Sequence, residues 1–314
     1  MAGLPPLPRA HTAGMDDRRP RYLALGPEEI ASRARRGREM LRACRMCGRQ
    51  CQVDRIAAVR PSICRTGDRA VIAAWGVRPG DAGFLAFGRC SLRCVFCPTW
   101  MTSQGRWGRE LPSEEVAERM LALQDRGCRV LHLLHPTSVV HAVLEALALA
   151  VARGFSLPLV YQSSGYDGVE ALRLLDGIVD VYVVEMKWGD SREGLWFSKV
   201  HNYASVNRRA VLEMHRQVGD LELDGAGLAV RGLAVRHVVL PGSLGSTGRV
   251  VKFLAEEVSP ATWLDLDLTY EPAHRATLYP PLDRRPTARE KTDARRLAHR
   301  HGLHRVRSGA PTAL

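Results

Sequence analysis

The chain has 314 residues, of which 46% are hydrophobic and 25% are charged. This composition allows one large or two modest globular domains and excludes a disordered chain, a collagen-like repeat and a small disulfide scaffold. The formal net charge is +12, but all but four of the 45 basic residues are arginine. Such a bias, spread over a whole chain, is weak evidence for a nucleic-acid partner.

No apolar run approaches the roughly 18 residues that span a bilayer. The first residues also lack the apolar segment of a signal peptide. We therefore expect a cytoplasmic, reducing location, and neither nucleic acid nor a membrane as a partner.

The chain divides by composition into four parts. Residues 1–22 are rich in proline and arginine and are expected to be a disordered tail. An N-terminal helix and a cysteine-rich module are expected in residues 23–75. The main domain is expected in residues 76–306, and a second disordered tail in residues 307–314.

Strand-like and helix-like segments alternate in the main domain. After short strands within 71–89, the expected strands are 129–134, 157–162, 179–185, 233–240 and 262–268. The expected helices are 27–43, one from 113, 138–153, 168–176, 206–218, 247–258 and one opened by a capping box at 287–290. About six such units predict an α/β fold with parallel strands, built as an open, partial (β/α)6-type barrel.

Three of the eight cysteines, Cys90, Cys94 and Cys97, have the spacing CxxxCxxC. Clustered thiols in a reducing compartment bind metals or do redox chemistry. A loop with this spacing can place three thiolates around one iron–sulfur cubane. Since four ligands would close the cluster, three leave one iron open to a small molecule.

A second group of cysteines precedes the first. Cys44, Cys47, Cys51 and Cys64 have the pattern of a closed four-coordinate site, which suits either structural zinc or a fully ligated second iron–sulfur cluster. A module that binds only zinc is one alternative. The remaining Cys128 is expected to be a small core residue.

The stretch CSLRCVFC around Cys90, Cys94 and Cys97 resembles the signature of the radical S-adenosylmethionine (SAM) enzymes. Between about residues 40 and 305 the chain also resembles the uncharacterised subfamily related to pyruvate formate-lyase activating enzyme. Four further stretches carry this second resemblance: CRMCGRQC, LPLVYQSSGYD, MHRQVGDL and RGLAVRHVVLPG.

The resemblance implies a [4Fe-4S] cluster held by Cys90, Cys94 and Cys97, with SAM on its fourth iron. One electron, from a donor such as a flavodoxin or ferredoxin, would cleave SAM to methionine and a 5′-deoxyadenosyl radical. That radical would abstract a hydrogen atom from an unknown substrate, a metabolite or a protein. The resemblance thus implies an oxidoreductase of the activating-enzyme type.

Four polar residues after predicted strands are candidates for contacting SAM: Ser163, Ser164, Glu185 and Lys187. The chain differs from the resembled pattern at Leu133 and Leu134, where relatives have two glycines. Leucines restrict the backbone and are expected to crowd SAM. This difference favours an alternative function, an iron–sulfur protein with a degenerate SAM site that acts in electron transfer or as a scaffold.

Overall fold

The computed structural model describes residues 19–57 and 62–309. In this part, ten strands form one sheet in the order β10-β9-β8-β6-β5-β4-β2-β1-β3, with β7 paired to β8. Neighbours from β2 to β10 are parallel, whereas β1 and β3 join the edge antiparallel. The sheet does not close on itself, because β3 and β10 are its two ends, and this confirms the predicted open α/β fold.

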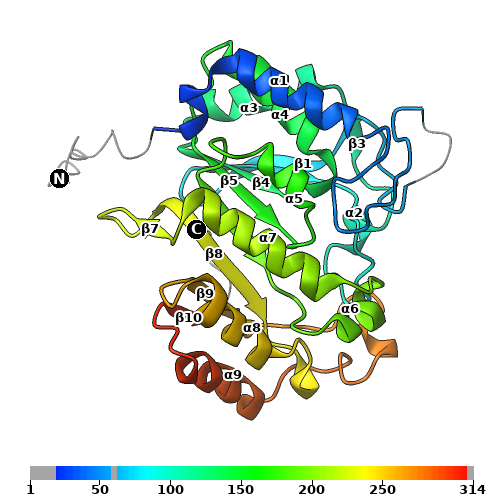
Figure 1. Ribbon diagram of the computed structural model, residues 1–314, viewed down its shortest axis with the longest axis vertical. Helices are drawn as coiled ribbons and strands as arrows, with labels where there is room; N and C mark the ends of the chain where they lie inside the picture. Colours follow the sequence, from blue (N-terminus) through cyan, green and yellow to red (C-terminus); the bar gives the residue numbers. More distant parts are fainter. Residues whose placement is uncertain (1–18, 58–61, 310–314) are drawn as a thin grey trace, which may run out of the picture.

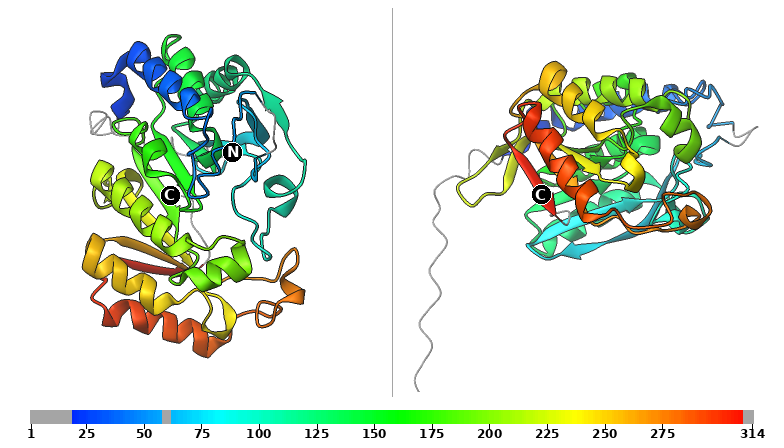
Figure 2. Two further views of the ribbon diagram at one scale, coloured as in Figure 1. Left: turned by 45° about the vertical axis from the view of Figure 1, so that its right-hand side comes forward. Right: turned by 90° about the horizontal axis from the view of Figure 1, so that it is seen from below.

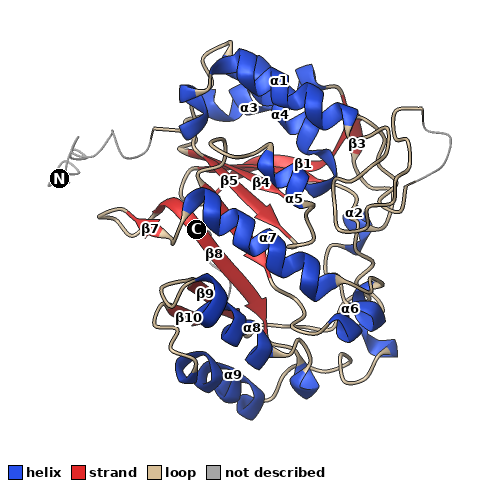
Figure 3. Cartoon of the chain, viewed as in Figure 1, coloured by secondary structure: helices blue, strands red, loops and turns tan. Residues whose placement is uncertain are grey.

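The strands have the following bounds: β1 Ala70–Arg78, β2 Ala82–Phe87, β3 Arg109–Leu111, β4 Val130–Leu134, β5 Leu159–Ser163, β6 Val181–Glu185, β7 Glu222–Leu223, β8 Ala229–Val238, β9 Trp263–Asp267 and β10 Val306–Gly309. Parallel strands of this kind are buried on both faces, which explains their nearly continuous apolar runs. Figure 3 shows α1, α3 and α4 above the strands, α8 and α9 below them, and α5 and α7 in front.

The helices have the following bounds: α1 Gly26–Glu39, α2 Trp100–Ser103, α3 Ser113–Asp125, α4 Val140–Val151, α5 Val169–Arg173, α6 Ser191–Ser198, α7 Tyr203–Val218, α8 Thr247–Phe253 and α9 Ala288–Arg300. A π-helical turn, Leu254–Val258, follows α8. Figure 1 shows α1, α3 and α4 gathered at one end of the molecule and α8 and α9 at the other. The right-hand view of Figure 2 shows most helices on one side of the sheet, so they leave its inner face free for a site.

The two faces of each central strand have different neighbours. In β4, Leu131 and Leu133 belong to the large core beneath the helices. His132 and Leu134 alternate with them and line an internal cavity instead. This alternation follows from the two-residue period of a strand and places polar side chains inside the barrel.

The N-terminal module lies against the barrel through backbone contacts. The Gly48 amide donates to the Tyr166 carbonyl at 3.0 Å, and the Gly168 amide donates to the Met46 carbonyl at 3.0 Å. A Cβ at Gly48 would lie only 2.6 Å from Val206. Only glycine therefore allows this close approach of module and barrel.

Two predicted boundaries differ from the structure. A 3-10 helix, Arg21–Ala24, contains the fully buried Tyr22, so the ordered chain begins before residue 23. Strand β10 extends to Gly309, beyond the expected end of the domain at residue 306, because its backbone pairs with β9. Residues 1–18 and 310–314 of the two predicted tails lie outside the described residues.

The last helix begins as predicted. The Thr287 hydroxyl accepts from the Glu290 amide and the Glu290 carboxylate accepts from the Thr287 amide, which is the predicted capping box. Helix α6 and strands β3 and β10 were not predicted, because they are short and lack a clear period. In the described part of the chain, no helix combines the length and the apolar character needed to cross a bilayer.

Candidate functional site

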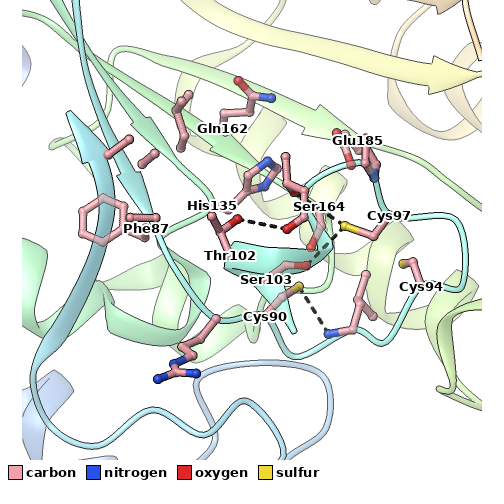
Figure 4. Close-up of a pocket in the computed structure, with 18 of the residues that line it drawn as sticks. Phe87, Cys90, Cys94, Cys97, Thr102, Ser103, His135, Gln162, Ser164 and Glu185 are labelled. Atoms are coloured by element: carbon pink, nitrogen blue, oxygen red, sulfur yellow. Dashed lines mark hydrogen bonds between the residues drawn. The ribbon is translucent and has the colours of Figure 1, made fainter. Parts of the chain in front are cut away.

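The cysteine loop after β2 forms one wall of a cavity of about 580 Å³. Cys90, Cys94 and Cys97 all line it. Figure 4 shows Cys94 and Cys97 at one side of the cavity, and Gln162 and Phe87 at the other. The structure therefore brings the three predicted cluster ligands to one end of a single cavity.

The loop is held in place by segments far away in the sequence. The amides of Arg93 and Val95 donate to the carbonyls of Ser198 and Phe197, at the end of α6, at 3.0 and 2.9 Å. The Gln104 side chain donates to the Cys94 carbonyl at 2.8 Å. These bonds fix the backbone on which the thiols stand.

Each of the three sulfurs has a hydrogen-bond partner. The Leu92 amide donates to Cys90 Sγ at 3.4 Å. The Ser198 hydroxyl oxygen lies 3.0 Å from Cys94 Sγ. The Ser103 hydroxyl oxygen lies 3.2 Å from Cys97 Sγ. Hydrogen bonds to ligating sulfurs tune iron–sulfur clusters, so this arrangement suits such a group.

Burial raises the pKa of the Cys90 thiol to about 12 and that of the Cys94 thiol to about 11. The neighbouring cysteines also raise both values, because adjacent thiolates repel one another. A positively charged metal group would remove this penalty, since metal ligation deprotonates a thiol.

Across residues 19–57 and 62–309, no group of three or more His, Cys, Asp or Glu side chains forms a site for a metal ion. A cubane attaches each cysteine to a different iron, so its thiols stand further apart than the ligands of one ion. The three thiols, their hydroxyl and amide partners and the cavity beside them suit a cluster.

Three of the four predicted SAM contacts line the same cavity, namely Ser164, Glu185 and Lys187. Glu185 and Lys187 form a partly buried ion pair. Burial opposes the charge on Lys187, but Glu185 outweighs it and holds the pKa of the ammonium above its usual range. The pair can orient a polar ligand beside the cysteine loop.

Ser163 does not line the cavity. Its hydroxyl donates to the Asp167 carboxylate and accepts from the Gly165 amide at 2.9 Å. The reason is strand alternation: Gln162 faces the cavity, so Ser163 faces away from it. Ser163 holds the turn after β5, and the prediction of a SAM contact there finds no support in the geometry.

Only one of the two leucines that were expected to crowd SAM lies at the cavity. Leu133 is in the helix-side core, away from the cavity, and Leu134 alone lines it. Both are strand residues, so neither needs the backbone freedom of glycine. The residue that does adopt a left-handed backbone conformation here is His135, which follows directly after β4 and has a φ of 60°.

The cavity also contains polar residues that are not among the predicted site residues, including Arg78, His132, Gln162 and Arg236. The two-residue alternation in β4 and β5 was the available signal, since His132 and Gln162 stand on the face of their strands that looks inward. Sequence alone does not say which face of a fully buried strand looks inward.

The four-cysteine module forms a second cluster of thiols. Cys44, Cys47 and Cys64 are buried, and the pKa of Cys47 is raised by burial to about 12, with further contributions from Cys64 and Cys44. Burial also disfavours the Cys64 thiolate, but Arg55 and the hydroxyl of Ser62 outweigh it and lower the pKa of Cys64. The module's thiols therefore lie within electrostatic reach of one another, and a single zinc ion there would require them to draw closer together. Cys128 is buried in the main core, as predicted.

The sequence matches the family model of the radical SAM superfamily over residues 85–246. A curated relative, the uncharacterized protein MJ0674 of Methanocaldococcus jannaschii, is 28% identical over 223 residues, which cover 68% of this chain and 61% of the relative. The chain belongs to the radical SAM superfamily.

Two solved structures have a similar arrangement of elements. One is a radical SAM methyltransferase from Sphaerobacter thermophilus, with 14% identity, a TM-score of 0.49 and coverage of 74% of this chain and 68% of that chain. The other is TYW1 with a lysine–pyruvate adduct bound, with 12% identity, a TM-score of 0.46 and coverage of 72% and 75%.

Membership of the superfamily implies a [4Fe-4S] cluster and SAM. The geometry fits both groups, because the three thiols meet one cavity that also carries polar side chains from β5 and β6. Cys90, Cys94 and Cys97 would hold the cluster. Ser164, Glu185 and Lys187 would lie beside SAM.

Proposed function

We propose that this protein is a radical SAM enzyme of the activating-enzyme type, with its cluster on Cys90, Cys94 and Cys97. When bound there, the cluster would supply one electron to SAM, whose sulfur–carbon bond would break to give methionine and a 5′-deoxyadenosyl radical; that radical would take a hydrogen atom from the substrate and become 5′-deoxyadenosine. The chain itself supplies position and the exclusion of water.

The observation that carries the proposal is the placement of the three thiols. All three line one end of a cavity whose other walls carry a few polar side chains among apolar ones and which has room for a small molecule. Lys187 and Ser164 offer a hydrogen-bonding cation and hydroxyl at that end. An acidic electron carrier, a flavodoxin or ferredoxin, is the donor we propose, since exposed Lys199 follows directly after the α6 end that holds the loop.

The test is anaerobic reconstitution with iron and sulfide, followed by dithionite and SAM. We expect 5′-deoxyadenosine from the wild type and from Cys128→Ala, a matched control because Cys128 is a buried cysteine outside both groups. Cys94→Ala should lose the cluster's EPR signal and the product. No product from wild type with an intact cluster would overturn the enzyme proposal and favour the electron-transfer or scaffold alternative.

We further propose a second metal centre, zinc or iron–sulfur, on Cys44, Cys47, Cys51 and Cys64. The observation that favours it is Arg55, which is only 3% exposed. Its guanidinium donates to the carbonyls of Thr66 and Ser138, both at 2.8 Å, and approaches Cys44 Sγ at 3.6 Å. Among the described residues no carboxylate pairs with it, so thiolates bound to a metal would supply the missing negative charge.

Metal analysis tests this second centre. About four irons and four sulfides per chain indicate one cubane, about eight indicate two, and one zinc with one cubane indicates a zinc module. Cys64→Ala should lose the second metal and keep the EPR signal of the first cluster. Unchanged metal content in Cys64→Ala would contradict the second centre.

A further inference from the structure

We propose that the inner end of the cavity binds the anionic group, a carboxylate or a phosphate, of a small-molecule substrate, and that Arg78 and His132 hold that group. The inference rests on the proposed function, because it concerns the molecule that would lose the hydrogen atom. It narrows that molecule from any metabolite or protein to a small organic anion, so the likeness to activating enzymes would extend to the radical chemistry and not to a protein substrate.

The inner end is the part of the cavity away from the cysteine loop, beside β1, β2 and β4. Phe84 in β2 and His132 in β4 are direct register partners, and Arg78 ends β1, which pairs with β2. All three side chains line the cavity. Phe84 lies within β2, whereas Cys90 lies beyond the end of that strand. The residues between them add a rise of about 3.3 Å each while they are in the strand. The inner end is therefore separated from the thiols, with space between them for the reacting atoms.

Arg78 has a positive charge that the described protein does not neutralise. Its guanidinium lies over the Phe84 ring, 4.8 Å from the ring centroid. In the described part of the chain, no carboxylate forms an ion pair with it. A planar guanidinium that is stacked on a ring and has its donors free is suited to bind a carboxylate or phosphate through two hydrogen bonds.

His132 is the second observation, and it is independent of the first. Its side chain is 4% exposed, and its Nε2 is buried without a hydrogen-bond partner. Burial, and to a smaller extent Arg78, lower the pKa of His132 to about 4, so the imidazole is neutral. A neutral imidazole can donate one hydrogen bond. Buried polar atoms nearly always have a partner, and His132 lines the cavity, so a turn of its ring would give this nitrogen a partner on a ligand there.

The charge of the cavity agrees with an anion. Its lining includes four cationic side chains, Arg78, Arg89, Lys187 and Arg236, against one carboxylate, Glu185. Lys187 is paired with Glu185 and Arg236 with Asp265, so Arg78 and Arg89 are the lining cations that no ion pair of the described residues neutralises. A volume of about 580 Å³ suits small molecules and not a folded partner, particularly when a nucleoside occupies the cysteine end.

The test measures binding to the reconstituted protein with SAM present. Inorganic phosphate and succinate are the two anionic probes, and uncharged succinamide is the control ligand, each titrated by calorimetry. We expect one of the anions to bind the wild type and succinamide not to bind. Arg78→Gln and His132→Leu should each weaken that binding about tenfold, the amount expected for a charge-assisted hydrogen bond.

Arg126→Gln is the matched control, since it removes the same charge from an exposed side chain outside the cavity. It should bind the anion like the wild type, and SAM affinity should be unchanged in all three variants, which also shows that they fold. Arg78 is exposed, so Arg78→Gln remains informative if His132→Leu does not fold.

Three results would overturn the inference: no binding of either anion by the wild type, equal binding by Arg78→Gln, or displacement of the anion by SAM. The last result would assign the inner end to SAM itself. Loss of the cluster or of 5′-deoxyadenosine in the same preparations would instead contradict the proposed function, so the two failures are distinguishable.

Discussion

Leu133 and Leu134 are neighbours in β4, yet they belong to different parts of the molecule. Leu133 is 1% exposed and packs in the core under the helices, while Leu134 lines the cavity. Side chains of a strand alternate, so one step along the chain moves a residue from the core to the site. The sequence difference that matters for SAM is therefore at position 134.

Alanine substitutions at Leu133 and Leu134 should affect different properties: the first mainly the stability of the fold, the second mainly the affinity for SAM. Leu133→Ala removes a fully buried side chain and should lower the free energy of unfolding by about 2–5 kcal/mol. Leu134→Ala should lower it less, because one side of Leu134 already faces a cavity, and should change SAM affinity. Chemical unfolding and equilibrium SAM binding on both variants check this, and a larger stability loss from Leu134→Ala would contradict it.

Helix α6 shapes the cysteine loop through its last residue. The Trp188 indole N–H donates to Ser198 Oγ at 2.7 Å, which leaves the Ser198 hydroxyl hydrogen for Cys94 Sγ at 3.0 Å. The carbonyl of the same residue accepts from the Arg93 amide. One serine thus orders a buried tryptophan, the loop backbone and a proposed cluster ligand.

Removal of this hydroxyl should change the cluster more than the fold. In Ser198→Ala the Cys94 sulfur loses a hydrogen bond that stabilises the more negative, reduced cluster, so the reduction potential should become more negative. An EPR-monitored redox titration measures this. Ser205→Ala on α7 is the control, since Ser205 is exposed and bonds only the Asn202 carbonyl. An unchanged potential in Ser198→Ala would show that this hydroxyl does not act on the cluster.

At the scale of the whole molecule, the core contains three buried histidines in different regions: His132, His141 and His237. Burial lowers the pKa of each to about 4. The unfolded chain binds these protons near pH 6.5, whereas the folded chain does not. Their contribution to stability is therefore complete above pH 6.5 and is lost as the pH falls toward 4.

The free energy of unfolding should accordingly decrease from pH 6.5 to 4. His237→Gln should reduce this slope by about 1.4 kcal/mol per pH unit, the value for one proton. The His237 Nδ1–H donates to the Met186 carbonyl, and its Nε2 accepts from the Thr247 hydroxyl. Because the substitution also loses these bonds, the slope and not the absolute stability is the measurement. His299→Gln, at an exposed position, should keep the wild-type slope. Equal slopes in His237→Gln and wild type would contradict a neutral His237.

Much of the architecture could be predicted from the sequence. The five main strands, the open parallel sheet and the capping box at Thr287 follow from local patterns, because apolar period, capping chemistry and β-branched runs act over a few residues. Strand β10 could not be predicted, since its pairing with β9 defines it. Helix α6 could not be predicted because it has only eight residues and no clear period.

The chemistry of the site divides in the same way. The spacing of Cys90, Cys94 and Cys97 determined by itself that three thiols lie on one loop, because they are covalently close. Only the tertiary structure decided that Ser163 faces away while Gln162 faces in, and that Arg78 and His132, far apart in the chain, meet at the inner end. Those choices depend on which face of each strand the helices cover, and the packing of the whole barrel determines that.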